Sequence, residues 1–136
     1  MEERDAIFRD KLTALMADLN GGEGRDKKLR RTIGAYSDKL AQEAGAKDWG
    51  DLKERADGTT YDSLLRFFQR QTETMQKHGD HEGVRALEIL AISLIARRQY
   101  AEDLLPGITF LDRYIAECAR NARKFGAQIL PPVSRH

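Results

Sequence analysis

The sequence has one cysteine, three prolines and no long apolar run, and each scarcity excludes a class of protein. A single thiol cannot form an internal disulfide, which suits a reducing compartment. The longest apolar run, from Ile89 to Ala96, is interrupted by Ser93 and is far too short to span a bilayer. The first residues, MEERDAIFRD, are charged and acidic, unlike a secretory signal. A cytoplasmic location is therefore expected.

A dominant charge of one sign is also missing. Lys and Arg total 23 against 22 Asp and Glu, so the formal net charge is only +1. Bulk charge therefore favours neither nucleic acid nor a membrane surface, and no membrane partner is expected. Any electrostatic function must come from local clusters. The length of 136 residues fits one domain with a core of its own.

What the chain does contain is helical periodicity, and it is strongest from Asp80 to Leu105, before Pro106. One apolar stripe at helical spacing consists of Val84, Leu87, Ala91 and Leu94, and a second consists of Ile89, Ile92 and Ala96. A helix that is apolar nearly all round must be buried by other helices. Residues 83–104 are therefore predicted to be the buried central helix of a bundle.

Helical patterns also cover residues 2–19, 25–45, 46–57, 59–77 and 107–128, and most of them end at glycines. Asp48 and Asp80 are expected to be N-caps. There is no internal repeat and no strand-like alternation of useful length. The chain is therefore predicted to be a single all-α bundle of five or six helices over residues 1–128, followed by an extended tail, 129–136, that contains Pro131-Pro132.

The last predicted helix carries more apolar surface than one neighbour can cover. Its main seam consists of Ile108, Leu111, Ile115, Cys118, Ala122, Phe125 and Ile129. Phe110 and Tyr114 form a second strip, and Phe67 lies beside the buried stripe of residues 59–77. Either the central and first helices cover both strips, or one strip forms a homodimer interface. The second alternative predicts a small interaction or regulatory module that self-associates through Phe67, Phe110 and Tyr114.

No catalytic motif occurs, so the chain is expected not to be an enzyme and to need no cofactor. Cys118 lies within the apolar seam and is expected to be a core residue. The densest set of possible metal ligands consists of His78, Asp80, His81 and Glu82. Because these residues straddle a predicted helix break, helix capping explains them as well as a metal does.

Cations are concentrated at the start of the second predicted helix. They are Arg25, Lys27, Lys28, Arg30 and Arg31. Cations at a helix N-terminus oppose the macrodipole by about 0.3–1 kcal/mol each when exposed, so a chain with five of them there can be using them. They form either a solvated face or a set of phosphate contacts for nucleic acid. A second basic group, Arg113, Arg120, Arg123 and Lys124, can contribute if the fold brings it alongside.

A further indication of nucleic-acid binding comes from Leu40-Ala41, Glu43-Ala44-Gly45, Leu52, Glu54, Gly58 and Leu64-Leu65. On these residues, the segment from Lys27 to Phe68 resembles a phage-repressor-type helix-turn-helix. The resemblance implies that residues 47–56 enter the major groove of DNA. That helix is net acidic, and the spacing from Leu40 to Gly58 is about one residue longer than the pattern. A nucleic-acid-binding regulator that uses the basic second helix is therefore the alternative function.

Overall fold

The computed structural model describes residues 3–55, 58–99 and 107–125, which form six α-helices and one short 3-10 helix. The helices are α1 (Glu3–Asn20), η1 (Gly22–Arg25), α2 (Lys27–Glu43), α3 (Trp49–Arg55), α4 (Gly58–Lys77), α5 (His81–Gln99) and α6 (Gly107–Phe125). The predicted all-α bundle is confirmed. The predicted tail, 129–136, lies outside the described residues.

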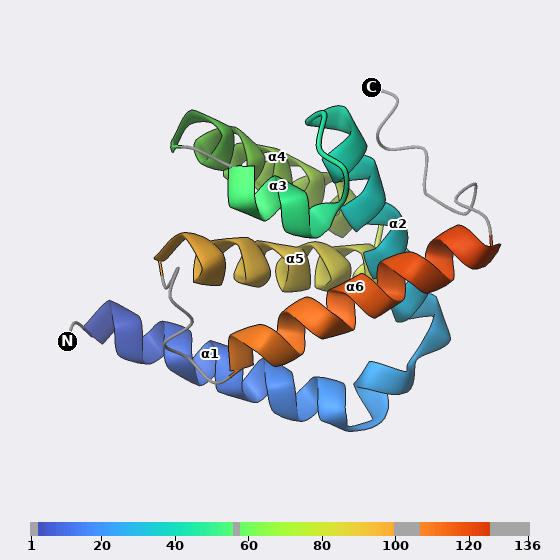
Figure 1. The fold of residues 1–136 in the computed structure, drawn as a ribbon. Coiled ribbons are helices and arrows are strands. Elements are labelled where there is room, and N and C mark those ends of the chain that lie inside the picture. The colour runs from blue at the N-terminus through green and yellow to red at the C-terminus, as the bar shows by residue number, and fades with distance from the viewer. Residues whose placement is uncertain (1–2, 56–57, 100–106, 126–136) are drawn as a thin grey trace.

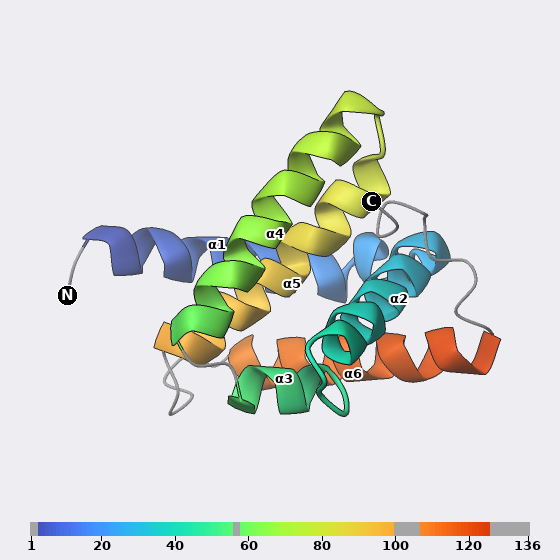
Figure 2. The same ribbon diagram turned by 90° about the horizontal axis from the view of Figure 1, so that it is seen from above.

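The bundle is arranged around α5. Helices α4 and α5 run side by side in opposite directions, and α1 lies on the other side of α5 from α4 (Figure 1). Helix α6 crosses the front of the bundle and packs against α2 (Figures 1 and 2). The short helix α3 contacts α2, α5 and α6.

Helix α5 is buried on most sides, as its two apolar stripes predict. Its side chains with at most 1% exposure are Ala86, Leu87, Ile89, Leu90, Ser93, Leu94 and Ala96. The helix begins as expected, because Asp80 Oδ1 accepts a hydrogen bond from the Gly83 backbone N–H at 2.9 Å. Gly79, with φ of 69°, ends α4. Of the predicted 83–104 helix, residues 100–104 lie outside the described part of the chain.

The start of the second helix differs from the prediction. Arg25 belongs to η1, and α2 begins at Lys27. The reason is that the Asp26 carboxylate accepts hydrogen bonds from the backbone N–H groups of Lys28 (2.9 Å) and Leu29 (3.1 Å). Asp26 is therefore the N-cap, and the predicted inclusion of Arg25 in the helix was wrong.

Helix α3 begins at Trp49 rather than at the predicted residue 46, its predicted end at 56–57 lies outside the described residues, and its cap is the expected one. Asp48 Oδ1 accepts a hydrogen bond from the Asp51 backbone N–H at 2.9 Å. Trp49 and Leu52 anchor the helix, with 4% and 2% of their surface exposed. Both expected anchors therefore face the core.

At Gly34 the backbones of α2 and α6 approach closely. A Cβ atom added at Gly34 would lie 2.2 Å from the Cys118 carbonyl oxygen and 2.8 Å from Ala122 Cβ. No side chain fits there, so glycine allows the two backbones to touch. The predicted seam is buried at Leu111, Ile115, Cys118 and Ala122. This crossing sets the relation between α2 and α6, on which the site below depends.

Among the described helices, none combines the length and the apolar character needed to cross a membrane.

Candidate functional site

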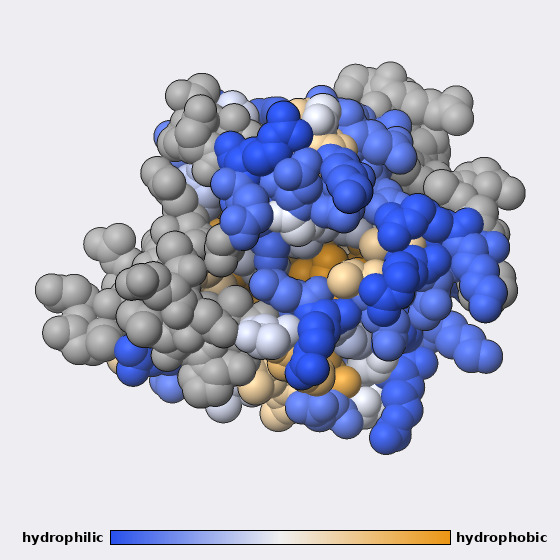
Figure 3. All heavy atoms as spheres, in the orientation of Figure 1, coloured by the Kyte–Doolittle hydropathy of each residue, from blue (hydrophilic) through white to orange (hydrophobic). Residues whose placement is uncertain are grey.

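A cationic groove lies between α2 and α6. Its lining includes, among the described residues, Lys27, Arg30, Arg31 and Asn121, and its volume is about 600 Å³. Lys27 and Arg31 are exposed and lie one helical turn apart, so they are on the same face of α2. Strongly hydrophilic residues cover the right-hand edge of the molecule, where α2 and the second half of α6 come together (Figure 3). We call this feature the α2–α6 groove.

The groove is made of side chains and is not the open end of a helix. The Asp26 carboxylate already occupies two backbone donors at the start of α2. An anion in the groove would therefore have to be bound by the guanidinium and ammonium groups and by Asn121. Three cationic residues and one asparagine line this space from two helices, and apolar atoms form most of its wall. The charged ends of these side chains can reach an anion there, which favours anion binding.

The structure brings only part of the predicted basic cluster into the groove. Lys27, Arg30 and Arg31 line it, whereas Arg25 lies exposed in η1. The Lys28 ammonium is 3.7 Å from Glu82 Oε1, at the start of α5. Lys28 is therefore engaged with α5 rather than with α6.

Two members of the second basic group on α6, Arg120 and Arg123, line a hollow between α3 and α6 rather than the α2–α6 groove. Arg120 and Lys124 are exposed on either side of Asn121 in the sequence. Arg123 donates a hydrogen bond to Asp38 Oδ1 on α2 at 2.7 Å. Since α6 packs against α2, exposed Lys124, one helical turn from Asn121, can extend the cationic surface beyond the groove.

The helix-turn-helix resemblance receives less support from the arrangement of the charges. The exposed part of α3 consists of Gly50, Glu54 and Arg55, and Arg55 donates a hydrogen bond to Asp51 Oδ2 at 3.1 Å. The basic residues lie at the opposite end of α2 from α3, roughly 20 Å away at 1.5 Å per residue. The groove and the predicted reading helix are thus separate surfaces.

The three residues predicted for a homodimer interface are all in contact with the core. Tyr114 is 8% exposed, and its hydroxyl donates a hydrogen bond to the Gly24 carbonyl oxygen at 3.2 Å. Phe110 is partly buried and stacks on Tyr114 with ring centres 6.3 Å apart. Phe67 is partly buried and lies edge-on to Phe68. The η1 segment covers Tyr114, which leaves that side chain unavailable to a partner in this conformation.

Three of the four residues considered for a metal, His78, Asp80 and Glu82, have other partners. His78 Nδ1 lies 2.8 Å from the Thr74 carbonyl oxygen, Asp80 caps α5, and Glu82 faces Lys28. Among the described residues, no group of three His, Cys, Asp or Glu side chains could hold a metal ion. Cys118 is fully buried, and burial raises the pKa of its thiol to about 11. Its thiolate, the reactive form, is therefore scarce at neutral pH.

A second hollow, of about 330 Å³, lies between α3 and α6, which run in opposite directions. Hydrophobic atoms are visible within it in Figure 3. At its wall the Lys53 ammonium contacts the Asp112 carboxylate and donates to Ser93 Oγ at 3.1 Å. Trp49 Nε1 also donates to Ser93, at 3.3 Å. Ser93, the polar residue within the apolar run of α5, thus joins three helices.

No family model matches the chain, no curated protein matches it, and no solved structure matches it. The candidate site therefore depends on its geometry alone.

Sequence reasoning missed two members of the groove environment. Asn121 is a polar residue among basic ones, and nothing local distinguishes it. Glu117 accepts a hydrogen bond from Arg30 across 87 positions of sequence. A signal was present for Glu117, because it is the one acidic residue between Arg113 and Lys124. The sequence does not show that Glu117 pairs with Arg30, because that pairing depends on how α6 packs against α2 at Gly34.

Proposed function

We propose that this chain is a binding protein that recognises nucleic acid through the α2–α6 groove. The observation that carries this proposal is the convergence of Lys27, Arg30 and Arg31 with Asn121 on one concave surface. The sequence alternative, a nucleic-acid-binding regulator, assigned phosphate contacts to the same α2 residues. The proposal keeps those contacts and does not use α3 as a reader of bases.

The chemistry of the groove fits a phosphodiester backbone. Guanidinium and ammonium groups neutralise phosphates and release the counter-ions condensed on the nucleic acid. Lys27 and Arg31 lie one helical turn apart, so they place two exposed cations on the same face of α2. Asn121 offers both a donor and an acceptor, which suits phosphate and sugar contacts or a base edge. Exposed Lys124, one helical turn from Asn121, continues the cationic surface along α6.

The test is fluorescence anisotropy with labelled single-stranded and duplex oligonucleotides at low and moderate salt. We expect a dissociation constant on the order of 10 µM at low salt and steep weakening as salt rises. The double variant Lys27→Ala/Arg31→Ala is expected to bind about tenfold more weakly and to reduce the salt slope by about two.

The control is Arg66→Ala/Arg70→Ala, which removes two charges at the same spacing from exposed positions of α4, a helix that packs against α5. Its affinity should match that of the unchanged protein. An equal loss in both double variants would show that only net charge matters, and the groove would then have no special role. Absence of binding to either oligonucleotide at low salt would reject the proposed function.

Self-association as an interaction module stays a prediction. Among the described residues, Ile7 is the one large hydrophobic side chain classed as exposed, at 52%. Phe110 is partly buried against the core, so only part of its ring is available to a partner. Sedimentation velocity should detect a dimer that Phe110→Asp weakens at least tenfold, if the predicted strip is an interface. A monomer across the accessible concentration range would contradict that prediction.

A further inference from the structure

Arg30 differs from the other two cations of the groove because its side chain is held from three directions. Its Nη1 donates to the Gly24 carbonyl oxygen at 3.2 Å, and its Nη2 donates to Glu117 Oε1 at 2.5 Å. The guanidinium carbon lies 5.1 Å from the centre of the Tyr114 ring, within cation–π range. The side chain is 21% exposed, whereas Lys27 and Arg31 are exposed residues. Arg30 therefore loses little conformational freedom when it binds an anion.

The Gly24 carbonyl that holds Arg30 is itself fixed. It also accepts the hydroxyl of Tyr114, and a Cβ at Gly24 would lie 1.6 Å from the Leu19 carbonyl oxygen, so η1 lies directly against the end of α1.

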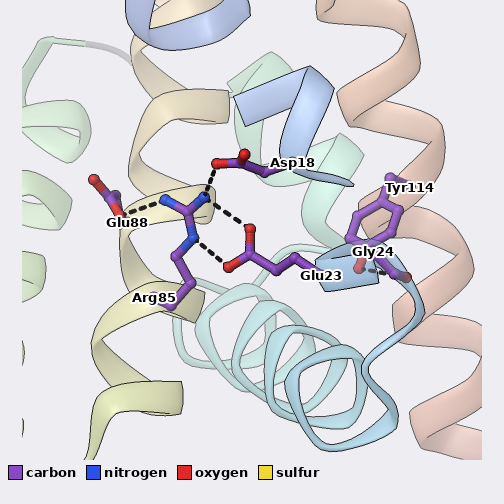
Figure 4. A network of polar contacts seen from close by, with 6 residues as sticks. All are labelled: Asp18, Glu23, Gly24, Arg85, Glu88 and Tyr114. Atoms are coloured by element: carbon purple, nitrogen blue, oxygen red, sulfur yellow. Dashed lines mark hydrogen bonds and ion pairs between the residues drawn. The ribbon is translucent and has the colours of Figure 1, made fainter. Parts of the chain in front are cut away.

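The preceding residue, Glu23, is clamped to α5 by Arg85 (Figure 4). Arg85 Nε and Nη2 reach the two Glu23 oxygens at 2.7 and 2.9 Å, and Arg85 also pairs with Asp18 and Glu88. The hydrogen bonds to Glu23 are the main reason that the pKa of Arg85 is raised. The hydrogen bonds from Arg85 fix the position of η1, and η1 in turn positions the Arg30 side chain through the Gly24 carbonyl oxygen.

Glu117 is the most exposed of the three groups that hold Arg30. Its side chain is 55% exposed, and it accepts one hydrogen bond from one guanidinium nitrogen. Exposed ion pairs contribute little, about 0–1 kcal/mol, so Glu117 can be displaced. A phosphate carries more charge and more acceptor oxygens than a carboxylate, and it can engage an arginine through two parallel hydrogen bonds.

We propose that Arg30 is the residue that anchors a phosphate group in the α2–α6 groove, and that Glu117 is the counter-ion which this phosphate displaces. The inference deepens the proposed function, since it concerns the same groove. The phosphate can belong to a nucleic-acid backbone or to a free polyphosphate, because the recognised chemistry is the same. In the free protein Glu117 competes with the phosphate for Arg30.

Two variants separate this role from general cationic attraction. Arg30→Lys keeps the charge but loses the planar fork, so affinity for an oligonucleotide should fall about tenfold with the salt slope nearly unchanged. Glu117→Gln keeps the shape but removes the competing charge, so affinity should rise about fivefold. A gain in affinity cannot come from damage to the fold. The controls are Arg66→Lys and Glu73→Gln, the same two exchanges at exposed positions of α4. They should change neither the affinity for the oligonucleotide nor its salt slope.

The experiment titrates each variant with a labelled oligonucleotide and, separately, with inorganic pyrophosphate. Anisotropy follows the first titration, and the NMR signal of the Arg30 Nε–H group follows the second. We expect both probes to bind, with lower affinity for Arg30→Lys and higher affinity for Glu117→Gln. A second outcome separates the two proposals. If pyrophosphate shifts the Arg30 NMR signal and Glu117→Gln raises the affinity for pyrophosphate, while the oligonucleotide does not bind, the phosphate anchor is supported and the proposed function fails.

Two results overturn the inference. In the first, the oligonucleotide binds, but Arg30→Lys lowers its affinity no more than Arg66→Lys does, and Glu117→Gln does not raise it. The groove would then bind nucleic acid without a distinct anchor. In the second, neither probe binds at low salt, which rejects the anchor and the proposed function together.

Discussion

Replacing Gly34 with alanine is expected to lower the free energy of unfolding by about 3 kcal/mol. The added methyl would lie 2.2 Å from the Cys118 carbonyl oxygen and 2.6 Å from its carbonyl carbon, both of which are backbone atoms that no rotamer change can move. Helices α2 and α6 would have to separate. Alanine is otherwise the better helix former, by about 1 kcal/mol, so the clash must outweigh a local gain.

Urea denaturation followed by circular dichroism measures this effect. The matched control is Gly50→Ala on α3, where the nearest atom to an added Cβ is Asp48 Oδ1 at an acceptable 3.4 Å. That variant should be unchanged or stabilised by up to about 1 kcal/mol, because only the propensity term acts there. If Gly34→Ala were also within about 1 kcal/mol of the unchanged protein, the close crossing would not exist in solution.

The helices could be predicted because the information that specifies them is local. Asp80 caps α5 and Gly79 ends α4 through contacts within a few residues, and the stripes of α5 and α6 recur at helical spacing. The start of α2 was missed for a local reason as well. Asp26 competes with a longer helix by binding two of its first backbone donors, which leaves Arg25 in the 3-10 turn.

The candidate site could be predicted only in part, because the groove is a product of tertiary packing. The sequence identifies the cations on α2, but not that Lys28 pairs with Glu82 while Lys27 lines a groove with Asn121. Gly34 looks like an ordinary helix residue until α6 lies against it. Tyr114 looks like a residue with spare apolar surface, and it is buried because η1 folds back over it.

Replacing Asp112 with alanine is expected to cost about 3 kcal/mol of stability. Its carboxylate contacts the Lys53 ammonium, and the Lys53 side chain is only 5% exposed. A buried ammonium that loses a carboxylate keeps its desolvation penalty without that compensation. Ser93 Oγ, at 3.1 Å, remains an acceptor but carries no charge. For comparison, Glu43→Ala removes an exposed pair with Lys39 and should cost less than about 0.5 kcal/mol.

Lys53→Met provides the decisive second half of this experiment, because methionine fills similar space without a charge to bury. Alone, it should be nearly neutral, since Asp112 is 39% exposed and water can solvate it. Combined with Asp112→Ala, it should recover most of the lost stability. A double variant whose loss equals the sum of the two single losses would mean that the groups act independently. Recovery instead would mean that Asp112 is needed to accommodate Lys53, and that α3 depends on α6 for a place to bury its lysine.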